Sequence, residues 1–160
     1  NGEFAERFEG RNLDLICILQ PEPLLIRADS RRIWRVLENL YVNVCKYAMP
    51  GTRVYVDAIK KDGKIQFSIK NISENPLNFQ ADELTERFIR GDVSRSTEGS
   101  GLGLSIAKNL TVLQHGTFNI YLDGDLFKVT ITFDEAVKEK KPMSPMIVPE
   151  PVQEEAQQDV

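Results

Sequence analysis

The sequence predicts a single domain of the α/β class, containing both helices and strands. Two observations carry this prediction. A long run with helical periodicity follows Asp29, and pairs of alternating apolar and polar segments meet at two Asp-Gly turns, Asp62-Gly63 and Asp123-Gly124. With 160 residues, the chain is long enough to bury a substantial core.

The first half is expected to contain strands followed by the longest helix. Residues 1–11 are charged and are typical of the end of an incoming helix or of a linker. Residues 13–19 are rich in Leu and Ile and predict a strand, and two prolines separate it from a short strand at 24–26. Asp29-Ser30 offers an N-cap for a helix that extends to Ala48, where a Met-Pro-Gly sequence ends it.

The second half is expected to return to strands around a second helix. Its predicted elements are strands at 53–60 and 64–70, an irregular stretch at 71–80, a short helix at 81–87, a polar segment ending at Ser100, an amphipathic helix at 102–113, and a hairpin of 118–122 with 127–133.

Composition divides the chain into three parts. We expect a linker at 1–12, one folded domain at 13–134, and a disordered tail at 135–160. The tail contains four prolines and no aromatic residue, and its charges are mainly acidic. Docking of the tail on a partner or on the domain itself is the alternative.

Bulk properties exclude some classes of function. The net charge of −4 and the pI near 5.1 argue against a nucleic-acid-binding surface. Cys17 and Cys45 each lie in an apolar stretch, so we expect two small buried hydrophobic residues rather than metal ligands or a disulfide, as suits a reducing cytosol. No stretch approaches the roughly 18 apolar residues of a membrane helix. The first residue is Asn1, so we expect a piece of a longer protein whose other parts could be membrane-bound.

The long helix carries polar side chains on one stripe. At about 100° per residue, Asn39, Asn43 and Lys46 fall within roughly 60° of one another. The neighbouring, core-facing side is expected to hold Ile33, Leu37, Leu40 and Val44. Asn oxygens can ligate Mg²⁺, and Lys is a point-charge partner for phosphate. The alternative is a solvated helix face that holds two Asn residues.

A glycine-rich segment, Glu98-Gly99-Ser100-Gly101-Leu102-Gly103-Leu104-Ser105, opens directly onto the second helix. Glycines let the backbone approach an anion closely, and a helix N-terminus presents unpaired N–H groups with a favourable dipole. A flexible turn is the alternative interpretation. The segment is neither a dinucleotide-binding fingerprint, because no strand immediately precedes it, nor a P-loop, because no Gly-Lys-Ser/Thr follows.

Three motifs together resemble the histidine-kinase ATPase domain of the GHKL superfamily, which includes gyrase B, Hsp90 and MutL. RRIWRVLENLYVNVCKYA resembles the N box, LTERFIRGD the F box, and GSGLGLSIAKNL the second glycine box. The resemblance covers about residues 13–133, and the sequences of the last two motifs are similar to those of bacterial sensor kinases. It implies a Bergerat-type, two-layer α/β sandwich with a mixed sheet, helices on one face, and an ATP lid between Ser73 and Ser100.

The resemblance also implies roles for individual residues. Asn43, with Asn39, would hold Mg²⁺ against the ATP phosphates, Lys46 would contact phosphate, and Tyr47 would pack beside the adenine. Arg90 would reach the γ-phosphate, so that Asn43, Lys46 and Arg90 form the catalytic set. Phe88 would anchor the lid. The remaining ATP-binding positions belong to the glycine segment and are Gly99, Ser100, Gly101, Leu102, Gly103 and Leu104.

One motif departs from the family pattern. Where the family has Asp-x-Gly-x-Gly, this chain has Asn71-Ile72-Ser73-Glu74-Asn75. The family's Asp accepts a hydrogen bond from the adenine amino group, and Asn71 keeps a carbonyl acceptor without the charge. A loss of about 0.5–1.5 kcal/mol would weaken nucleotide binding about two- to tenfold.

The resemblance predicts Mg²⁺-dependent transfer of the ATP γ-phosphate to a histidine on a separate dimerisation helix, and then to a response regulator. The sole histidine, His115, ends the second helix and does not resemble a phosphoacceptor, so the acceptor is expected elsewhere in the parent, in the dimerisation helix that 1–12 would follow. Residues 1–160 alone are expected to be a cytoplasmic monomer without membrane contact or appreciable kinase activity. The alternatives are a degenerate domain that docks partners, and an ATPase using Glu38, which lies about 100° around the helix from Asn39.

Overall fold

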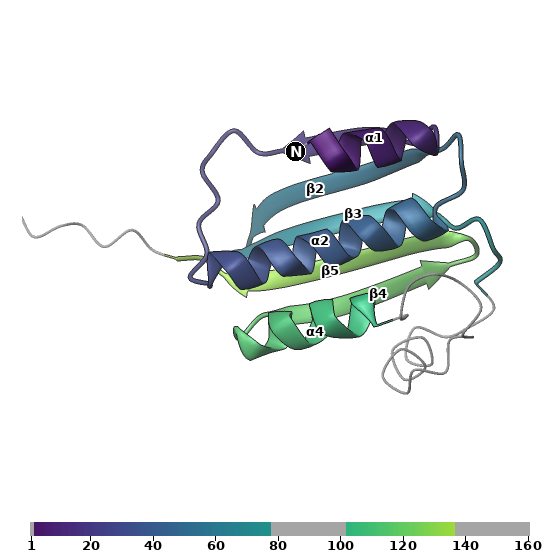
Figure 1. Ribbon diagram of the computed structural model, residues 1–160. Coiled ribbons are helices and arrows are strands. Elements are labelled where there is room, and N and C mark those ends of the chain that lie inside the picture. The colour runs from purple at the N-terminus through teal and green to yellow at the C-terminus, as the bar shows by residue number, and fades with distance from the viewer. Residues whose placement is uncertain (1, 78–101, 137–160) are drawn as a thin grey trace, which may run out of the picture.

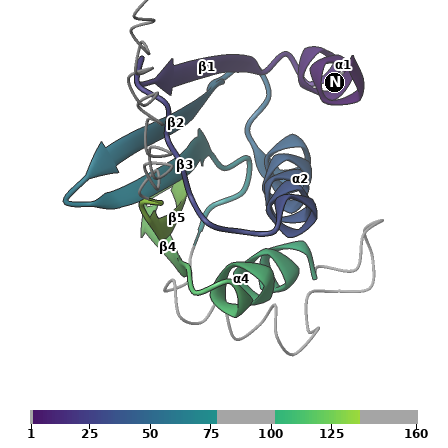
Figure 2. The same ribbon diagram turned by 90° about the vertical axis from the view of Figure 1, so that its left-hand side faces the viewer.

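A computed structural model of the chain describes residues 2–77 and 102–136. Its helices all lie on one face of a five-stranded sheet, so the described part has two layers (Figures 1 and 2). The elements in chain order are α1 (Gly2–Gly10), β1 (Asp14–Leu19), α2 (Ser30–Tyr47), β2 (Arg53–Lys61), β3 (Lys64–Ile72), α4 (Gly103–Leu113), β4 (Thr117–Asp123) and β5 (Leu126–Asp134).

The sheet is mixed, as expected. Its strand order is β1-β2-β3-β5-β4. β1 runs parallel to β2, whereas the other neighbouring strands are antiparallel. The β2–β3 hairpin turns at Asp62 and Gly63, whose φ angles of 51° and 71° are those a tight hairpin turn requires. The second turn lies at Gly124 and Asp125, one residue later than expected.

The start and end of α2 confirm the signals in the sequence. The carboxylate of Asp29 accepts hydrogen bonds from the backbone N–H groups of Arg31 and Arg32 at 2.9 and 3.1 Å. These bonds satisfy N–H groups that have no partner within the helix. Ala48 closes the other end with its N–H bonded to the Val44 carbonyl.

The core lies between α2, α4 and the helix-facing side of the sheet. Alternate residues of the strands point into it, among them Val54, Val56, Ile69 and Val129. The buried stripe of α2 is Val36, Leu40 and Val44. The sequence prediction missed Val36 and placed Leu37 in the core. Leu37 is only half-buried, because it lines a groove beside α1 instead.

The structure differs from the sequence prediction, or adds to it, at residues 24–26, at the two cysteines and at α1. Residues 24–26 form no strand, since Ile26 makes only an isolated bridge to Glu135. Cys17 is exposed rather than buried, because it belongs to β1, the strand at the edge of the sheet; Cys45 is half-buried, and both thiols are free. α1 is helical and contributes Phe8, 5% exposed, to the core.

The predicted helix at 81–87 and residues 137–160 of the predicted tail at 135–160 lie outside the described residues. The domain boundaries predicted from composition remain predictions. Among the described helices, none is both long and apolar enough to cross a membrane.

Candidate functional site

The polar stripe of α2 faces the beginning of α4. The Asn39 side-chain amide donates to the Arg35 carbonyl at 2.7 Å. A Cβ atom built on Gly103, the first residue of α4, would lie 3.2 Å from Asn39 Oδ1. Asn39 therefore presents its oxygen to the N-terminus of α4, and the absence of a side chain at Gly103 makes that approach possible.

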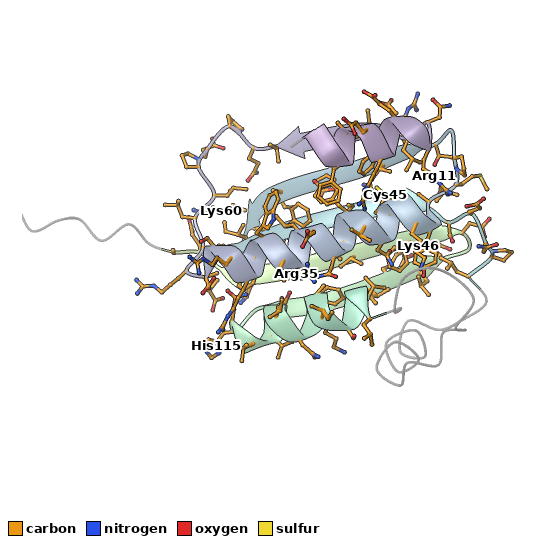
Figure 3. The ribbon with its side chains drawn as sticks, viewed as in Figure 1. Arg11, Arg35, Cys45, Lys46, Lys60 and His115 are labelled. Atoms are coloured by element: carbon orange, nitrogen blue, oxygen red, sulfur yellow. The ribbon has the colours of Figure 1, made fainter. Side chains whose placement is uncertain are left out.

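Lys46 lies on the same stripe, in the last turn of α2. Its ammonium group is 5.2 Å from the centroid of the Tyr47 ring. Figure 3 shows Lys46 at the end of α2, on the side where α4 begins. With Asn43 between Asn39 and Lys46 on the helix, two carboxamides and one cation line the approach to α4.

No side chain among the described residues caps the N-terminus of α4. Leu102 occupies the N-cap position and makes no side-chain hydrogen bond to the helix. Ser105 does not supply one, because its hydroxyl donates to the Leu102 carbonyl at 2.8 Å. The first-turn N–H groups and the helix dipole together favour an anion at this point.

Asn71, a further predicted site residue, lies near the end of β3. It is only 3% exposed, and its side-chain N–H donates to the Ile72 carbonyl at 3.1 Å. Its Oδ1 is buried and has no hydrogen-bond partner within the described residues. A buried carbonyl oxygen left without a donor costs stability, and a ligand's amino group would satisfy it. This unpaired acceptor fits the exocyclic amino group of adenine.

Backbone hydrogen bonds join the end of β3 to the end of α2. Met49 N–H donates to the Ile72 carbonyl at 2.8 Å, and Glu74 N–H donates to the Tyr47 carbonyl at 2.9 Å. Tyr47 is thereby held beside the segment that begins at Asn71. The structure thus brings Asn39, Asn43, Lys46, Tyr47, Asn71, Leu102, Gly103 and Leu104 to elements that border one region between α2, α4 and β3.

Five predicted site residues lie outside the described residues: Phe88, Arg90, Gly99, Ser100 and Gly101. His115 is described, and it is exposed at the opposite end of α4 from Gly103 (Figure 3). Its φ of 64° is the left-handed conformation in which helices commonly terminate.

The ligand chemistry of the described residues suits Mg²⁺ held jointly with phosphates. Among those residues no group of three or more His, Cys, Asp or Glu side chains could hold a metal. Asn39 and Asn43 instead offer neutral oxygen ligands, and Mg²⁺ in phosphoryl-transfer sites takes much of its coordination from the substrate phosphates. The donor set therefore fits the predicted cofactor.

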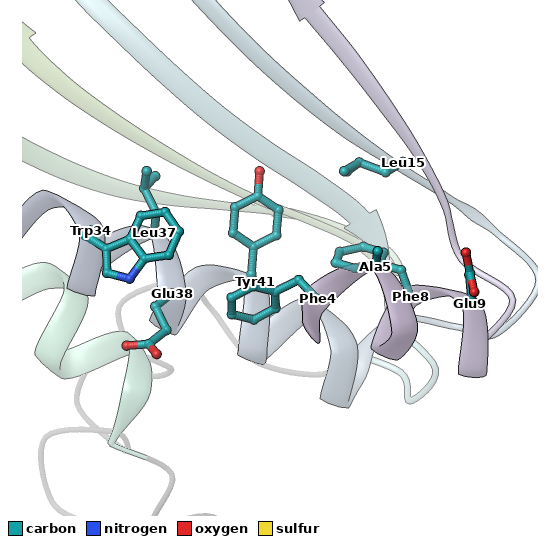
Figure 4. A pocket seen from close by; sticks show the side chains of 9 residues that line it. All are labelled: Phe4, Ala5, Phe8, Glu9, Leu15, Trp34, Leu37, Glu38 and Tyr41. Atoms are coloured by element: carbon teal, nitrogen blue, oxygen red, sulfur yellow. The ribbon is translucent and has the colours of Figure 1, made fainter. Parts of the chain in front are cut away.

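An apolar groove, which the sequence analysis missed, lies between α1, α2 and β1 (Figure 4). Its volume is about 470 Å³, and its lining residues are Phe4, Ala5, Phe8, Glu9, Leu15, Trp34, Leu37, Glu38 and Tyr41. Glu38, the base that an ATPase mechanism would need, pairs here with Arg35 at 2.6 Å. The four-residue spacing of Phe4 and Phe8 was the available signal that α1 packs here.

Burial changes the pKa values of two side chains of α2, Tyr41 and Cys45. Burial raises the pKa of the Tyr41 hydroxyl, and it raises the pKa of the Cys45 thiol. Because a thiol reacts as its thiolate, the raised pKa makes Cys45 less reactive at neutral pH. Both groups behave as parts of the packed structure rather than as chemical participants.

Comparisons with known proteins identify the family. The sequence model of the histidine kinase-, DNA gyrase B-, and HSP90-like ATPase family matches residues 28–138. Signal transduction histidine-protein kinase BaeS of Escherichia coli is 31% identical over 117 residues, covering 72% of this chain and 25% of that protein. The heme sensor protein HssS of Staphylococcus aureus is 32% identical over 113 residues, covering 70% and 24%.

Solved structures share the fold. The catalytic domain of histidine kinase ThkA superposes with a TM-score of 0.70 at 23% identity, covering 84% of this chain and 86% of that one. The mycobacterial sensor histidine kinase MprB gives a TM-score of 0.66 at 23% identity, covering 84% and 91%.

The chain belongs to the histidine kinase-, DNA gyrase B-, and HSP90-like ATPase family. Within the family it is a catalytic, ATP-binding domain of the sensor histidine kinase type, as used in two-component signalling. It spans about a quarter of the length of the curated relatives it matches.

Proposed function

We propose that ATP binds with Mg²⁺ in the region bordered by α2, α4 and β3, and that the parent protein transfers the γ-phosphate to a histidine on a separate dimerisation helix. The unpaired Oδ1 of Asn71 carries this proposal, because it lies at the end of β3 that backbone hydrogen bonds join to α2. The adenine amino group donates to it, and the phosphates extend toward the uncapped N-terminus of α4.

Each of these side chains contacts a different part of the bound nucleotide. Lys46 neutralises phosphate, and Tyr47 packs beside the adenine. Asn43 and Asn39 hold Mg²⁺, which supplies charge neutralisation between the phosphate groups. Positioning and charge stabilisation are the protein's main contribution to phosphoryl transfer generally.

For residues outside the described ranges, the proposed roles are those that the family resemblance implies. Arg90 contacts the γ-phosphate, and Phe88 anchors the lid. Gly99, Ser100 and Gly101 continue the phosphate-binding segment that Leu102, Gly103 and Leu104 begin.

The proposed partners of this domain are the protein segments that accept the phosphate. The acceptor is a histidine on the parent's dimerisation helices, since His115 lies far from Lys46 along the helix layer (Figure 3). A response regulator then receives the phosphate from that histidine. The domain works in the cytoplasm, within a parent anchored in the cell membrane, and makes no contact with membrane or nucleic acid itself.

Calorimetric titration of the purified chain with a non-hydrolysable ATP analogue tests the proposal. Binding should strengthen with Mg²⁺, and Asn43→Ala should weaken it at least tenfold. Asn119→Ala, an exposed asparagine of β4, is the matched control and should bind as the unaltered chain does. Absence of binding at millimolar analogue would refute the proposal and favour a degenerate domain that docks partners.

A further inference from the structure

One arginine joins three segments that are far apart in the sequence. Arg11, directly after α1, donates from Nη2 to the Ala48 carbonyl at 2.6 Å and to the Glu74 carboxylate at 2.7 Å. The bond to Ala48 spans 37 residues and the bond to Glu74 spans 63. Figure 3 shows Arg11 at the same end of the helix layer as Lys46.

The two partners of Arg11 both belong to segments of the nucleotide site. Ala48 caps the last turn of α2, which carries Lys46 and Tyr47. Glu74 follows Asn71 by three residues, and its backbone N–H is bonded to the Tyr47 carbonyl. The guanidinium therefore holds the end of α2 and the segment after Asn71 against each other.

The backbone path of residues 71–77, at and after the end of β3, is held by contacts with other segments. Residues 71–77 contain no glycine. Ser73 N–H donates to the Asp125 carbonyl at 2.7 Å, which fixes the segment from the side of the β4–β5 turn. The Arg11–Glu74 pair fixes it from the side of α1. Loss of either contact would let the segment, and Asn71 with it, shift relative to Tyr47.

Arg11 is also tied to α1. Its own N–H donates to the carbonyls of Arg7 and Phe8 at 3.3 and 3.2 Å, so the residue continues the last turn of that helix. The side chain is 31% exposed and that of Glu74 is 45% exposed, and the Nε of Arg11 is buried without a partner among the described residues. An exposed ion pair contributes little, but a charge-assisted bond to a part-buried carbonyl contributes more.

We propose that Arg11 is a positioning residue of the nucleotide site, which couples α1 to the purine-binding side through Glu74 and Ala48. The inference rests on the proposed function, because Arg11 acts through Asn71 and Tyr47 rather than on the nucleotide. Coupling of this kind is reciprocal. A bound nucleotide therefore slows amide exchange at the end of α1, where Leu13 N–H is bonded to the Phe8 carbonyl at 2.9 Å.

Nucleotide titrations of matched variants test the coupling. Arg11→Gln, which loses the bonds to both Ala48 and Glu74, should weaken binding of the ATP analogue about three- to tenfold. Glu74→Gln, which loses the exposed ion pair alone, should weaken binding less, about two- to threefold. The double variant should be no weaker than Arg11→Gln alone, since both substitutions remove one interaction. The charge-reversed pair, Arg11→Glu with Glu74→Arg, should bind more tightly than either charge-reversed single variant.

The control is Lys64→Gln, which removes a similarly short ion pair, 2.6 Å to Asp134, at the other end of the sheet. It should leave the affinity unchanged. Exchange at Leu13 should slow on binding in the unaltered chain and not in Arg11→Gln. If Arg11→Gln does not fold, Glu74→Gln tests the ion pair alone, because the Glu74 side chain is half-exposed, and an affinity equal to that of the unaltered chain then overturns the role of Arg11.

The outcomes separate the two proposals. An unaltered chain that fails to bind the analogue contradicts the proposed function itself. An unaltered chain that binds, with Arg11→Gln within twofold of it or Lys64→Gln as impaired as Arg11→Gln, overturns the role of Arg11 alone.

Discussion

Asn39 and Gly103 approach so closely that a Cβ atom on Gly103 would lie 3.2 Å from the Asn39 oxygen. The contact joins the polar stripe of α2 to the first residue of α4. A proposed Mg²⁺ ligand and a proposed phosphate-binding helix terminus thus depend on the same short distance. This dependence makes Gly103 a sensitive position at which to test the site.

Gly103→Ala should lower nucleotide affinity without lowering stability. The added methyl group displaces the Asn39 oxygen at the surface, whereas alanine is at least as good a helix former as glycine. Titration with the ATP analogue and thermal unfolding measure the two effects separately. Gly10→Ala, where a Cβ would meet nothing within 4 Å, is the control and should bind normally. Equal affinity in Gly103→Ala and the unaltered chain would contradict the assignment.

Gly116→Ala should destabilise the fold and should leave the site chemistry intact. A Cβ at this position would lie 2.6 Å from Phe133 Cε1 and 2.9 Å from Thr111 Cγ2, both in buried side chains. Overpacking of this kind costs about 1–3 kcal/mol. Urea unfolding should show the loss, and a midpoint equal to that of the unaltered chain would show that Phe133 moves aside at no cost.

The contribution of Asp29 to stability should depend on pH. The pKa of Asp29 lies below its ordinary value, chiefly because the Arg32 backbone N–H donates to the carboxylate, with the Arg31 N–H adding to the effect. A lowered folded-state pKa gives stability that is present above the unfolded-state pKa and lost as pH falls through the folded-state value.

The stability difference between the unaltered chain and Asp29→Ala should therefore be full at pH 7 and should shrink below about pH 4. Thermal unfolding of both chains across this range measures it. A difference that stays constant from pH 7 to pH 2 would argue against the charged cap.

Asn71→Asp should change affinity and stability in opposite directions. A charged acceptor should bind the adenine amino group about two- to tenfold more tightly. Without nucleotide, the buried carboxylate loses the donor that now bonds to the Ile72 carbonyl, so the melting temperature at pH 7 should fall.

Burial raises the folded-state pKa of such a carboxyl group, so the stability deficit of Asn71→Asp should shrink as the pH is lowered and the group becomes protonated. Melting curves at pH 5 and pH 7, with and without the ATP analogue, measure both effects. A variant that is as stable as the unaltered chain at pH 7 and binds no more tightly would contradict this account of Asn71.

Local signals in the sequence were sufficient to predict most of the elements. Asp29 is a cap whose partners are two and three residues away, and the Asp62-Gly63 turn is equally local. The polar stripe of α2 follows from helical geometry alone, because Asn39, Asn43 and Lys46 recur at helical spacing.

Features that depend on tertiary packing were not predictable in this way. Cys17 was expected to be buried because its neighbours are apolar, but the position of its strand at the edge of the sheet is decided by the order of all five strands. The contacts of Arg11 with Ala48 and Glu74 join segments 37 and 63 residues apart, and no local pattern marks them.

The most direct test of the nucleotide site is a titration of isotopically labelled chain with the Mg²⁺-bound ATP analogue, followed by nuclear magnetic resonance. Two separate regions compete for the ligand: the region between α2, α4 and β3, and the apolar groove at Trp34. We expect the largest shifts at the Asn71 side-chain amide and the Gly103 backbone amide, with the Trp34 indole nearly unchanged. Dominant shifts at Trp34, with Asn71 and Gly103 unmoved, would contradict the proposed nucleotide site.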